Sequence, residues 1–158
     1  MKNDKLIEKF RHVGIITRNL KEALYFYCEL LGCKVVVELI EEGPYISKLI
    51  GIENCKIKVA KVASPDGTVL EIIQFLTPDV ISTSNDRFNV IGFNHICFST
   101  DNIEKIYEKL KNKNIKFFSP PLKSPYDPVK TMFCYAPDNS IVQFVEVIDT
   151  KTIRKGLE

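Results

Sequence analysis

Residues 10–32, FRHVGIITRNLKEALYFYCELLG, decide the fold, because residues 93–110, FNHICFSTDNIEKIYEKL, repeat their pattern later in the same chain. Each stretch opens with a phenylalanine two positions before a histidine, which is His12 in the first and His95 in the second. A short β-prone run and then a run of apolar residues at helical spacing follow in both stretches. A repeat of this kind indicates that the chain is built from two similar supersecondary units.

The repeat continues in the turns that precede the last strand of each half. The turn sequence PDG at residues 65–67 corresponds to PDN at 137–139, and Glu71 corresponds to Gln143 at the same offset. Turn residues of this chemistry join hydrophobic runs that have strand character. Each half therefore follows one order, which is a strand, a helix and then three strands.

Hydrophobic periodicity gives the expected bounds of these elements. The first half is predicted to contain strands at 12–16, 35–39, 57–63 and 69–75 and a helix at 20–31. The second half is predicted to contain strands at 93–99, 116–118, 129–135 and 141–147 and a helix at 103–110.

The sequence thus predicts an α+β fold made of two βαβββ modules, because one such unit leaves a sheet face exposed and two together form one compact domain. The expected divisions are a first module at 1–76, a polar linker at 77–92, a second module at 93–148 and a C-terminal tail at 149–158.

Composition and charge exclude several classes of function. The 158 residues are 45% hydrophobic and 27% charged, which is ordinary for a single globular domain. A net charge of +2 is too small for a nucleic-acid surface, and no apolar run is long enough to cross a membrane. Five cysteines without a CxxC pair, and an N-terminus without an apolar signal core, predict a cytoplasmic protein with reduced thiols.

Four polar residues occupy equivalent positions in the two halves. His12 and His95 are the two histidines of the chain, and Glu71 and Gln143 each interrupt an apolar strand. An ionised carboxylate in such a run is costly unless it is paired or binds a metal. Two imidazoles, one carboxylate and one amide oxygen suit a divalent ion such as Zn, Ni, Co, Mn or Fe. The sequence therefore predicts one metal site with two ligands from each half.

Two alternatives to this ligand set are open at the level of the sequence. Glu71 can instead pair with Lys58 or Lys61, and both histidines can be buried, hydrogen-bonded residues of the core. Glu146 has the opposite strand parity from Gln143, so it replaces Gln143 as the fourth ligand only if a bulge shifts the register.

Four segments of the chain resemble the vicinal oxygen chelate superfamily, the group of glyoxalases, bleomycin-resistance proteins and extradiol dioxygenases. The matching segments are RHVGIITRNLKEALYFYCELLG, SPDGTVLEIIQF, GFNHICFSTDNIEKIYEKLKNKNIKF and APDNSIVQFVEV. The resemblance implies that paired modules form a cup-shaped mixed β-sheet, with helices outside, around one divalent metal. It places His12, Glu71, His95 and Gln143 at the metal positions, with glutamine at a position where glutamate is usual.

Within that superfamily the chain looks closest to glyoxalase I-like and methylmalonyl-CoA epimerase-like members. The likeness implies a metal-dependent lyase, isomerase or epimerase, whose small substrate chelates the metal through its oxygens and passes through an enolate-like intermediate. It makes Glu71 the candidate catalytic base if this carboxylate can leave the metal, and leaves the base unassigned otherwise. Tyr126 and Lys130, in and after a proline-rich loop, are candidates for binding an anionic substrate, and a homodimer is implied.

Two other functions are compatible with the same resemblance. A non-haem iron dioxygenase would use two histidines and one carboxylate, but such members usually carry further histidines and this chain has no third. A non-catalytic protein that sequesters a ligand, like the bleomycin-resistance members, would not need the histidines and the carboxylate that this chain retains.

Overall fold

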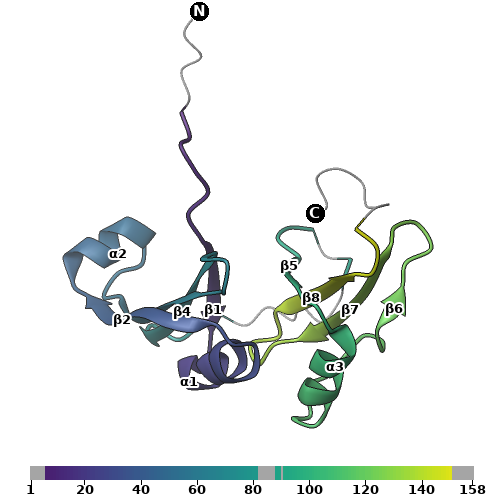
Figure 1. Ribbon diagram of the computed structural model, residues 1–158. Helices are drawn as coiled ribbons and strands as arrows, with labels where there is room; N and C mark the ends of the chain where they lie inside the picture. The colour runs from purple at the N-terminus through teal and green to yellow at the C-terminus, as the bar shows by residue number, and fades with distance from the viewer. Residues whose placement is uncertain (1–5, 82–87, 90, 151–158) are drawn as a thin grey trace, which may run out of the picture. The chain divides into compact units, whose positions relative to one another are not determined.

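The computed structural model describes residues 6–81, 88–89 and 91–150. The chain divides into two compact units, Met1–Ile81 and Ser82–Glu158, each built around one four-stranded sheet (Figure 1). Residues 82–87 and 90 of the predicted linker, and residues 151–158 of the predicted tail, lie outside the described part. No helix within the described part is long and apolar enough to span a membrane.

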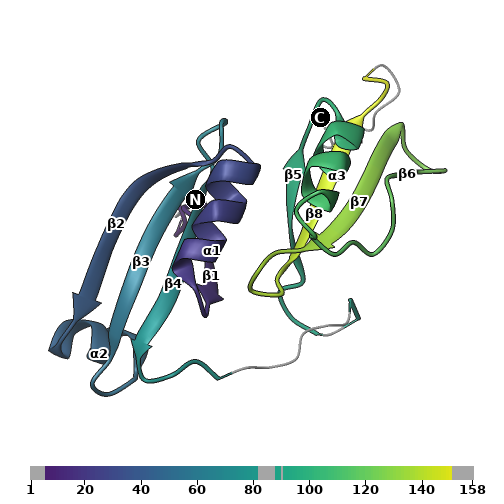
Figure 2. The ribbon, with the colours of Figure 1, turned by 90° about the horizontal axis from the view of Figure 1, so that it is seen from below.

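The first unit contains, in chain order, β1 (Val13–Thr17), α1 (Leu20–Leu24), the π-helix η1 (Tyr25–Leu30), β2 (Lys34–Glu42), α2 (Pro44–Ile50), β3 (Lys56–Ala63) and β4 (Val69–Thr77). Its sheet has the order β1-β4-β3-β2, in which β1 runs parallel to β4 and the other neighbours are antiparallel. Figure 2 shows this order, with α1 against the part of one face that β1 and β4 form.

The second unit contains β5 (His95–Ser99), α3 (Ile103–Lys111), β6 (Leu122–Lys123), β7 (Val129–Tyr135) and β8 (Ile141–Val147). Its sheet has the order β5-β8-β7-β6. The edge strand β5 runs parallel to its neighbour β8, and the other neighbours are antiparallel, as in the first unit. The two units therefore share one topology, which confirms the predicted α+β class and the βαβββ repeat.

Each sheet buries one face against its helix. In the first unit this layer consists of Ile15, Leu20, Ala23, Phe26, Tyr27, Leu30, Ala60, Val62, Leu70 and Ile72. In the second unit it consists of Ile103, Leu110, Met132, Cys134, Val142 and Phe144. Burying one large apolar side chain contributes about 1.5–3 kcal/mol, so this layer is the main source of stability in each unit.

The other face of each sheet, which we call the open face, is formed by the strand residues of opposite parity. In the first unit, Glu71 of β4 lies on it between its register partners Gly14 of β1 and Lys61 of β3. In the second unit, Gln143 of β8 lies on it between Cys97 of β5 and Phe133 of β7. The predicted ligand positions thus lie on the face opposite α1 in the first unit and opposite α3 in the second.

The predicted helix at 20–31 forms, but its second part is a π-helix. Asn19 begins it by accepting hydrogen bonds at Oδ1 from the backbone N–H groups of Lys21 and Glu22, as the sequence indicates. At the other end the Leu31 N–H donates to the Phe26 carbonyl, five residues earlier, at 3.1 Å. The last turn is therefore wider than that of an α-helix.

Helix α2 has no counterpart among the predicted elements. It begins with Pro44 and ends at Gly51, whose φ of +71° suits glycine. Its buried residue Ile46 packs in a cluster with Ile57 and Val59 of β3, over part of the open face of the first sheet. One buried side chain in seven residues leaves too little periodicity for a sequence pattern to predict the helix.

The segment 116–118 does not form the strand of the second sheet that the sequence predicts. Phe117 makes an isolated bridge with Cys134, and β6 forms the edge of the sheet instead. The segment does run beside β7 for two hydrogen bonds, from the Phe118 N–H and to the Lys116 carbonyl. The two prolines that follow at 120–121 then interrupt the ladder, because proline has no N–H to donate.

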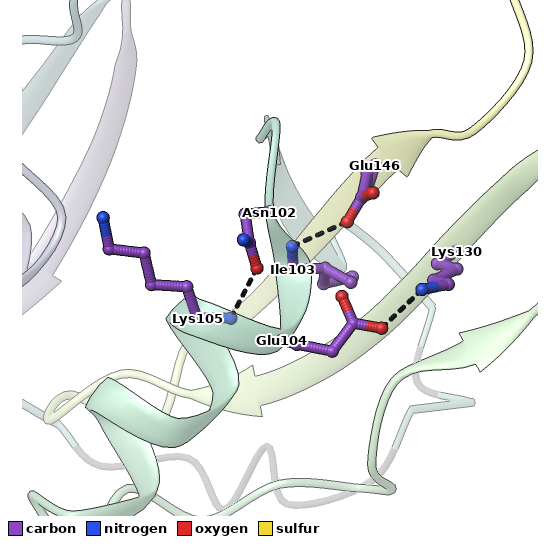
Figure 3. A network of polar contacts seen from close by, with 6 residues as sticks. All are labelled: Asn102, Ile103, Glu104, Lys105, Lys130 and Glu146. Atoms are coloured by element: carbon purple, nitrogen blue, oxygen red, sulfur yellow. Dashed lines mark hydrogen bonds and ion pairs between the residues drawn. The ribbon is translucent and has the colours of Figure 1, made fainter.

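A side chain from the last strand of each unit holds the start of the helix. The Oε1 atom of Gln74 accepts a hydrogen bond from the Leu20 N–H at 3.0 Å, and the Oε2 atom of Glu146 accepts one from the Ile103 N–H at 2.8 Å (Figure 3). The first N–H groups of a helix have no partner within the helix, so these contacts satisfy donors that are otherwise unpaired. They also fix each helix to the strand that carries the predicted ligand.

Replacing Glu146 with alanine is expected to lower the free energy of unfolding by about 1–2 kcal/mol, because the Ile103 N–H loses its acceptor. Glu146→Gln is expected to lose less, since Gln74 makes the same contact in the first unit. Urea unfolding followed by circular dichroism measures both changes. Glu108→Ala, on the exposed side of α3, is the control and should change stability by less than about 0.5 kcal/mol. Equal losses in all three variants would contradict this role for Glu146.

Candidate functional site

The first half of the candidate site is formed by His12 and Glu71. His12 lies immediately before β1, and Glu71 lies in β4 beside Gly14, two residues further along the same face. The parallel register brings the His12 Nε2 atom to 3.3 Å from the Glu71 Oε2 atom. The two side chains are 33% and 20% exposed, so both can reach a ligand on the open face.

Lys61 is the third charged group at this position. It is the register partner of Glu71 across the antiparallel pair of β3 and β4, and its Nζ lies 3.2 Å from the Glu71 Oε1 atom. Lys58, the other lysine that the sequence offered as a partner, lies on the opposite face and pairs with Glu38 at 2.8 Å. The half-buried Glu71 carboxylate is therefore compensated on both oxygens, by an imidazole and by an ammonium group.

The contact between His12 and Glu71 fits the chemistry of one metal ion. Two ligand atoms at about 2.0–2.1 Å from a single tetrahedral ion lie about 3.3 Å apart, which is the separation of these two atoms. The pair supplies one imidazole and one carboxylate, a combination that borderline divalent ions accept. These residues fit half of the predicted ligand set without rearrangement.

The second half of the candidate site begins with His95 in β5. The Asn94 Nδ2 group donates to the Phe88 carbonyl at 2.7 Å, so the Asn94 Oδ1 atom faces the His95 Nδ1 atom at 2.9 Å. The Asn94 Oδ1 atom can only accept, so the Nδ1 atom donates this hydrogen bond, and in the neutral imidazole the lone pair is then on Nε2. A hydrogen bond of this kind is how proteins set the tautomer and the orientation of a metal-binding histidine.

Gln143 lies on the same open face, in β8. Its Nε2 group donates to the Thr131 Oγ1 atom at 2.9 Å. This contact leaves the amide oxygen, the atom that would bind a metal, without a donor among the described residues. The register of β8 is regular at this point, with Gln143 between Cys97 and Phe133.

Aromatic rings surround His95 on the open face of the second unit. Phe88 stacks on the imidazole with ring centroids 5.9 Å apart, and Phe133 meets it edge-on at 5.4 Å. Phe118 meets both phenylalanines edge-on and stacks on Tyr135. Phe88 and Phe118 remain 44% and 42% exposed. We call Phe88, Phe118, Phe133 and Tyr135 the ring cluster.

Sequence reasoning missed Asn94 and the ring cluster. The signal for Asn94 is its place directly before the second histidine, where the first half has arginine. Phe133 could have been found from strand parity, because it opposes Gln143 once the hairpin register is known. Phe88 and Phe118 come from loops, where no periodicity reports which way a side chain faces.

Two residues that the sequence offered lie on the helix-covered face of the second unit. Glu146 bonds to the start of α3, so the bulge that would make it the fourth ligand is absent from β8 as described. The Lys130 ammonium group forms an ion pair with Glu104 of α3 (Figure 3). Lys130 is thus turned away from His95 and Gln143, and we leave it out of the candidate site.

Tyr126 is 82% exposed in the loop that precedes β7. Its backbone N–H donates to the Ser124 Oγ atom at 3.1 Å, which shapes the loop but leaves the ring projecting. Its role in substrate binding stays a prediction.

The structure therefore brings His12 together with Glu71 in one unit, and puts His95 and Gln143 on one face of the other. Each unit supplies two of the four predicted donors. Accordingly, within the described ranges no cluster of three or more histidine, cysteine, aspartate or glutamate side chains forms a complete metal site.

Comparison with known proteins identifies the family. The family model of the Glyoxalase/Bleomycin resistance protein/Dioxygenase superfamily matches residues 9–144, a range that contains all four predicted ligands. The chain belongs to this superfamily. The predicted resemblance is thereby confirmed, and the βαβββ units are those of a glyoxalase-type fold.

Individual members of the superfamily are similar at lower levels. A mitochondrial methylmalonyl-CoA epimerase of Dictyostelium discoideum is 29% identical over 116 residues, which are 72% of this chain and 62% of that protein. The chain thus spans about three fifths of the length of this relative. A glyoxalase family protein from Bacillus cereus has the same fold, with a TM-score of 0.84 at 20% identity over 94% of this chain and 99% of that chain. The trypanothione-dependent glyoxalase I of Leishmania major gives 0.64 at 15% identity over 89% and 87%.

The thiols of this superfamily member differ in their exposure. Cys33, Cys55 and Cys134 are buried, Cys28 is half-buried and Cys97 is exposed on the open face. Burial raises the pKa of Cys33 to about 11 and that of Cys134 to about 12. Desolvation by its neighbours also raises the pKa of Cys97, which argues against a Cys97 thiolate nucleophile activated by His95.

The thiols should react in the order of their exposure and acidity. At pH 8 we expect alkylation of the native protein to modify Cys97 first and to leave Cys33 and Cys134 unmodified, since a thiol with a pKa near 11 is only about 0.1% ionised there. Raising the pH increases the ionised fraction and therefore the rate. Peptide mass spectrometry after timed alkylation gives the order, and denatured protein provides the control in which all five react. Modification of native Cys134 as fast as Cys97 would contradict the packing described.

Proposed function

We propose that this superfamily member is a metal-dependent isomerase or lyase that transfers a proton beside a carbonyl oxygen of a small substrate. The observation that carries the proposal is the contact of 3.3 Å between the His12 Nε2 and Glu71 Oε2 atoms on an open sheet face. The repeat supplies the matching pair, His95 and Gln143, on the corresponding face of the other unit. Methylmalonyl-CoA epimerases and a glyoxalase I are among the proteins it resembles, which supports proton transfer over other chemistry.

The residues that would hold the ion are His12 and His95 through Nε2, Glu71 through Oε2 and Gln143 through its amide oxygen. A divalent ion bound by such residues supplies Lewis-acid stabilisation of negative charge that develops on a substrate oxygen. The four donors carry a single negative charge between them, so the site favours an ion of the Zn, Ni, Co, Mn or Fe type held largely by neutral ligands.

Glu71 is the proposed proton carrier. Its Oε2 atom contacts His12, and its Oε1 atom contacts Lys61. One oxygen can therefore face the proposed ion while the other faces the substrate. Accepting a proton removes the charge of Glu71, and the Lys61 ammonium group then loses its partner just as negative charge appears on the substrate. Tyr126 is the remaining candidate for contact with the substrate. The implied homodimer stays a prediction.

The ring cluster favours a second candidate function, the sequestration of a ligand without catalysis. Phe88, which stacks on His95, and Phe118, which meets Phe88 edge-on, both remain more than two fifths exposed. Exposed rings at a strand face are suited to stacking on a planar ligand. In this candidate function the histidines would contribute packing and hydrogen bonds only. Metal content separates the two functions.

Protein purified without chelator is expected to contain about one divalent ion per chain, measured by elemental mass spectrometry. His12→Ala and His95→Ala should each lose that ion, because each removes one of four donors. Glu71→Gln keeps an amide oxygen and should weaken binding less, because it removes only the charge of the one anionic donor. Glu38→Gln is the matched control, since Glu38 also pairs with a strand lysine but lies on the helix-covered face. Isomerisation of hemithioacetals and epimerisation of acyl-CoA thioesters are the activities to assay, and Glu71→Gln should lower either by at least about 100-fold. Metal-free protein that also refuses added ions would exclude the proposed function in favour of sequestration.

Asn94→Ala is expected to weaken metal binding by about 10–100-fold, because His95 loses the acceptor that sets its tautomer. Asn94→Asp keeps an acceptor for the Nδ1–H group and should retain most of the affinity. Competition with a chelating dye measures each dissociation constant. Asn112→Ala, at the end of α3, is the control with the same side chain removed elsewhere in the second unit. Equal affinities for Asn94→Ala and wild type would show that His95 needs no such orientation.

A further inference from the structure

Lys61 stands at a position that does not require a charge. The strand β3 turns Ile57, Val59 and Lys61 to the open face, and the first two are buried under α2. Phe133 holds the equivalent position of the second unit, where it opposes Gln143 as Lys61 opposes Glu71. The fold therefore accepts an apolar ring at this point, and the ammonium group is a property of this site alone.

The charges around the proposed ion do not cancel. A divalent cation with Glu71 as its one charged ligand leaves the centre with one positive charge, because the two histidines and Gln143 are neutral donors. The Lys61 Nζ atom, 3.2 Å from Glu71 Oε1, adds a second positive charge within contact distance of a ligand atom. Two carboxylate ligands, the set that the resemblance makes usual, would leave a bound divalent ion neutral. Here an excess of positive charge remains for the substrate to compensate.

Lys61 also has the freedom to make that contact. Its side chain is 35% exposed, and the atom that it contacts is the Glu71 oxygen that faces away from His12. A metal ion that binds the Oε2 atom withdraws charge from the whole carboxylate, which weakens the hold of Oε1 on the ammonium group. A lysine ammonium carries three N–H donors, so it can keep Glu71 and bind an additional anionic oxygen.

We propose that Lys61 is a specificity-determining residue that binds an anionic oxygen of the substrate, so that the site selects organic acids with a carboxylate beside the chelating oxygen over neutral dicarbonyl compounds. The inference rests on the proposed function, since it assumes an ion bound by His12 and Glu71. It extends that function by naming the charge of the substrate and the side chain that binds the charged group.

Three small planar chelators test the inference, because oxalate, oxamate and oxamide present the same pair of vicinal oxygens with two, one and no negative charges. Each is titrated by calorimetry into protein loaded with Zn or Mn, at fixed ionic strength. We expect wild-type protein to bind the chelators in that order of decreasing affinity. Lys61→Met should keep its metal but bind oxamate about tenfold more weakly, as expected for the loss of one hydrogen bond to a charged group.

Two further variants make the result specific to Lys61. Lys61→Arg retains the positive charge and should bind oxamate within about threefold of wild type. Lys58→Met removes a lysine from the same strand, on the opposite face, and should leave oxamate binding unchanged. An increase in salt concentration should weaken oxamate binding to wild type more than to Lys61→Met, because one charge fewer is screened.

The outcomes distinguish the inference from the function on which it rests. Metal-loaded Lys61→Met that binds oxamate as well as wild type would overturn the role of Lys61 and leave the proposed function standing. A loss of oxamide binding as large as that of oxamate would also overturn it, because it would indicate disturbed packing and not lost charge. Failure of every variant, wild type included, to take up metal would overturn both.

Discussion

The parallel pairing of the first and last strand of each unit is the constraint on which the rest of the structure depends. Two neighbouring parallel strands cannot be joined by a tight turn, so the chain between them must make a crossover. In both units this crossover contains a helix that covers the sheet and two antiparallel strands, and in the first unit it also contains α2. The pairing sets Gly14 beside Glu71 and therefore brings the residue before β1 to the start of β4. His12 and Glu71, far apart in sequence, become neighbours through backbone hydrogen bonds and not through their own attraction.

The same pairing explains why the first turn of α1 contacts β4 and the first turn of α3 contacts β8. Gln74 follows Glu71 by three residues, and Glu146 follows Gln143 by three, so each pair points to opposite faces of its strand. One member faces the ligand side, and the other accepts an N–H from the first turn of the helix. The carboxylate faces the ligand in the first unit and faces the helix start, where partial positive charge favours it, in the second. The two units thus use the same two side chains in exchanged roles.

The sequence predicts the fold well, because the repeat, the helix stripes and the strand runs are all local signals that the core layer then reinforces. Two predictions fail for equally local reasons. Helix α2 is missed because it buries only one side chain, and the strand predicted at 116–118 does not extend because prolines follow it. Strand parity was enough to put Gln143 and Glu146 on opposite faces of β8, and the structure then shows which of these faces α3 covers. Lys130 is a candidate only through its closeness to the proline-rich loop, whereas its register with Glu146 inside β7 puts it on the face that α3 covers. The contacts of Asn94 and Phe88 depend on a loop path that no pattern reports.

Glutamate and glutamine have exchanged roles in the two units, so the charge of an open face can change while the amino-acid composition of the chain stays the same. Swapping the residues at 143 and 146 would move a carboxylate from the helix start to the ligand side while the amino-acid content and formal net charge stay the same. The helix start would then be held by an amide, as it already is in the first unit. A duplicated module built in this way can change the charge of its binding surface in a single reciprocal step, without new secondary structure. Such an exchange would alter the charge of the proposed binding surface, while the strands and helices that position this surface stay the same.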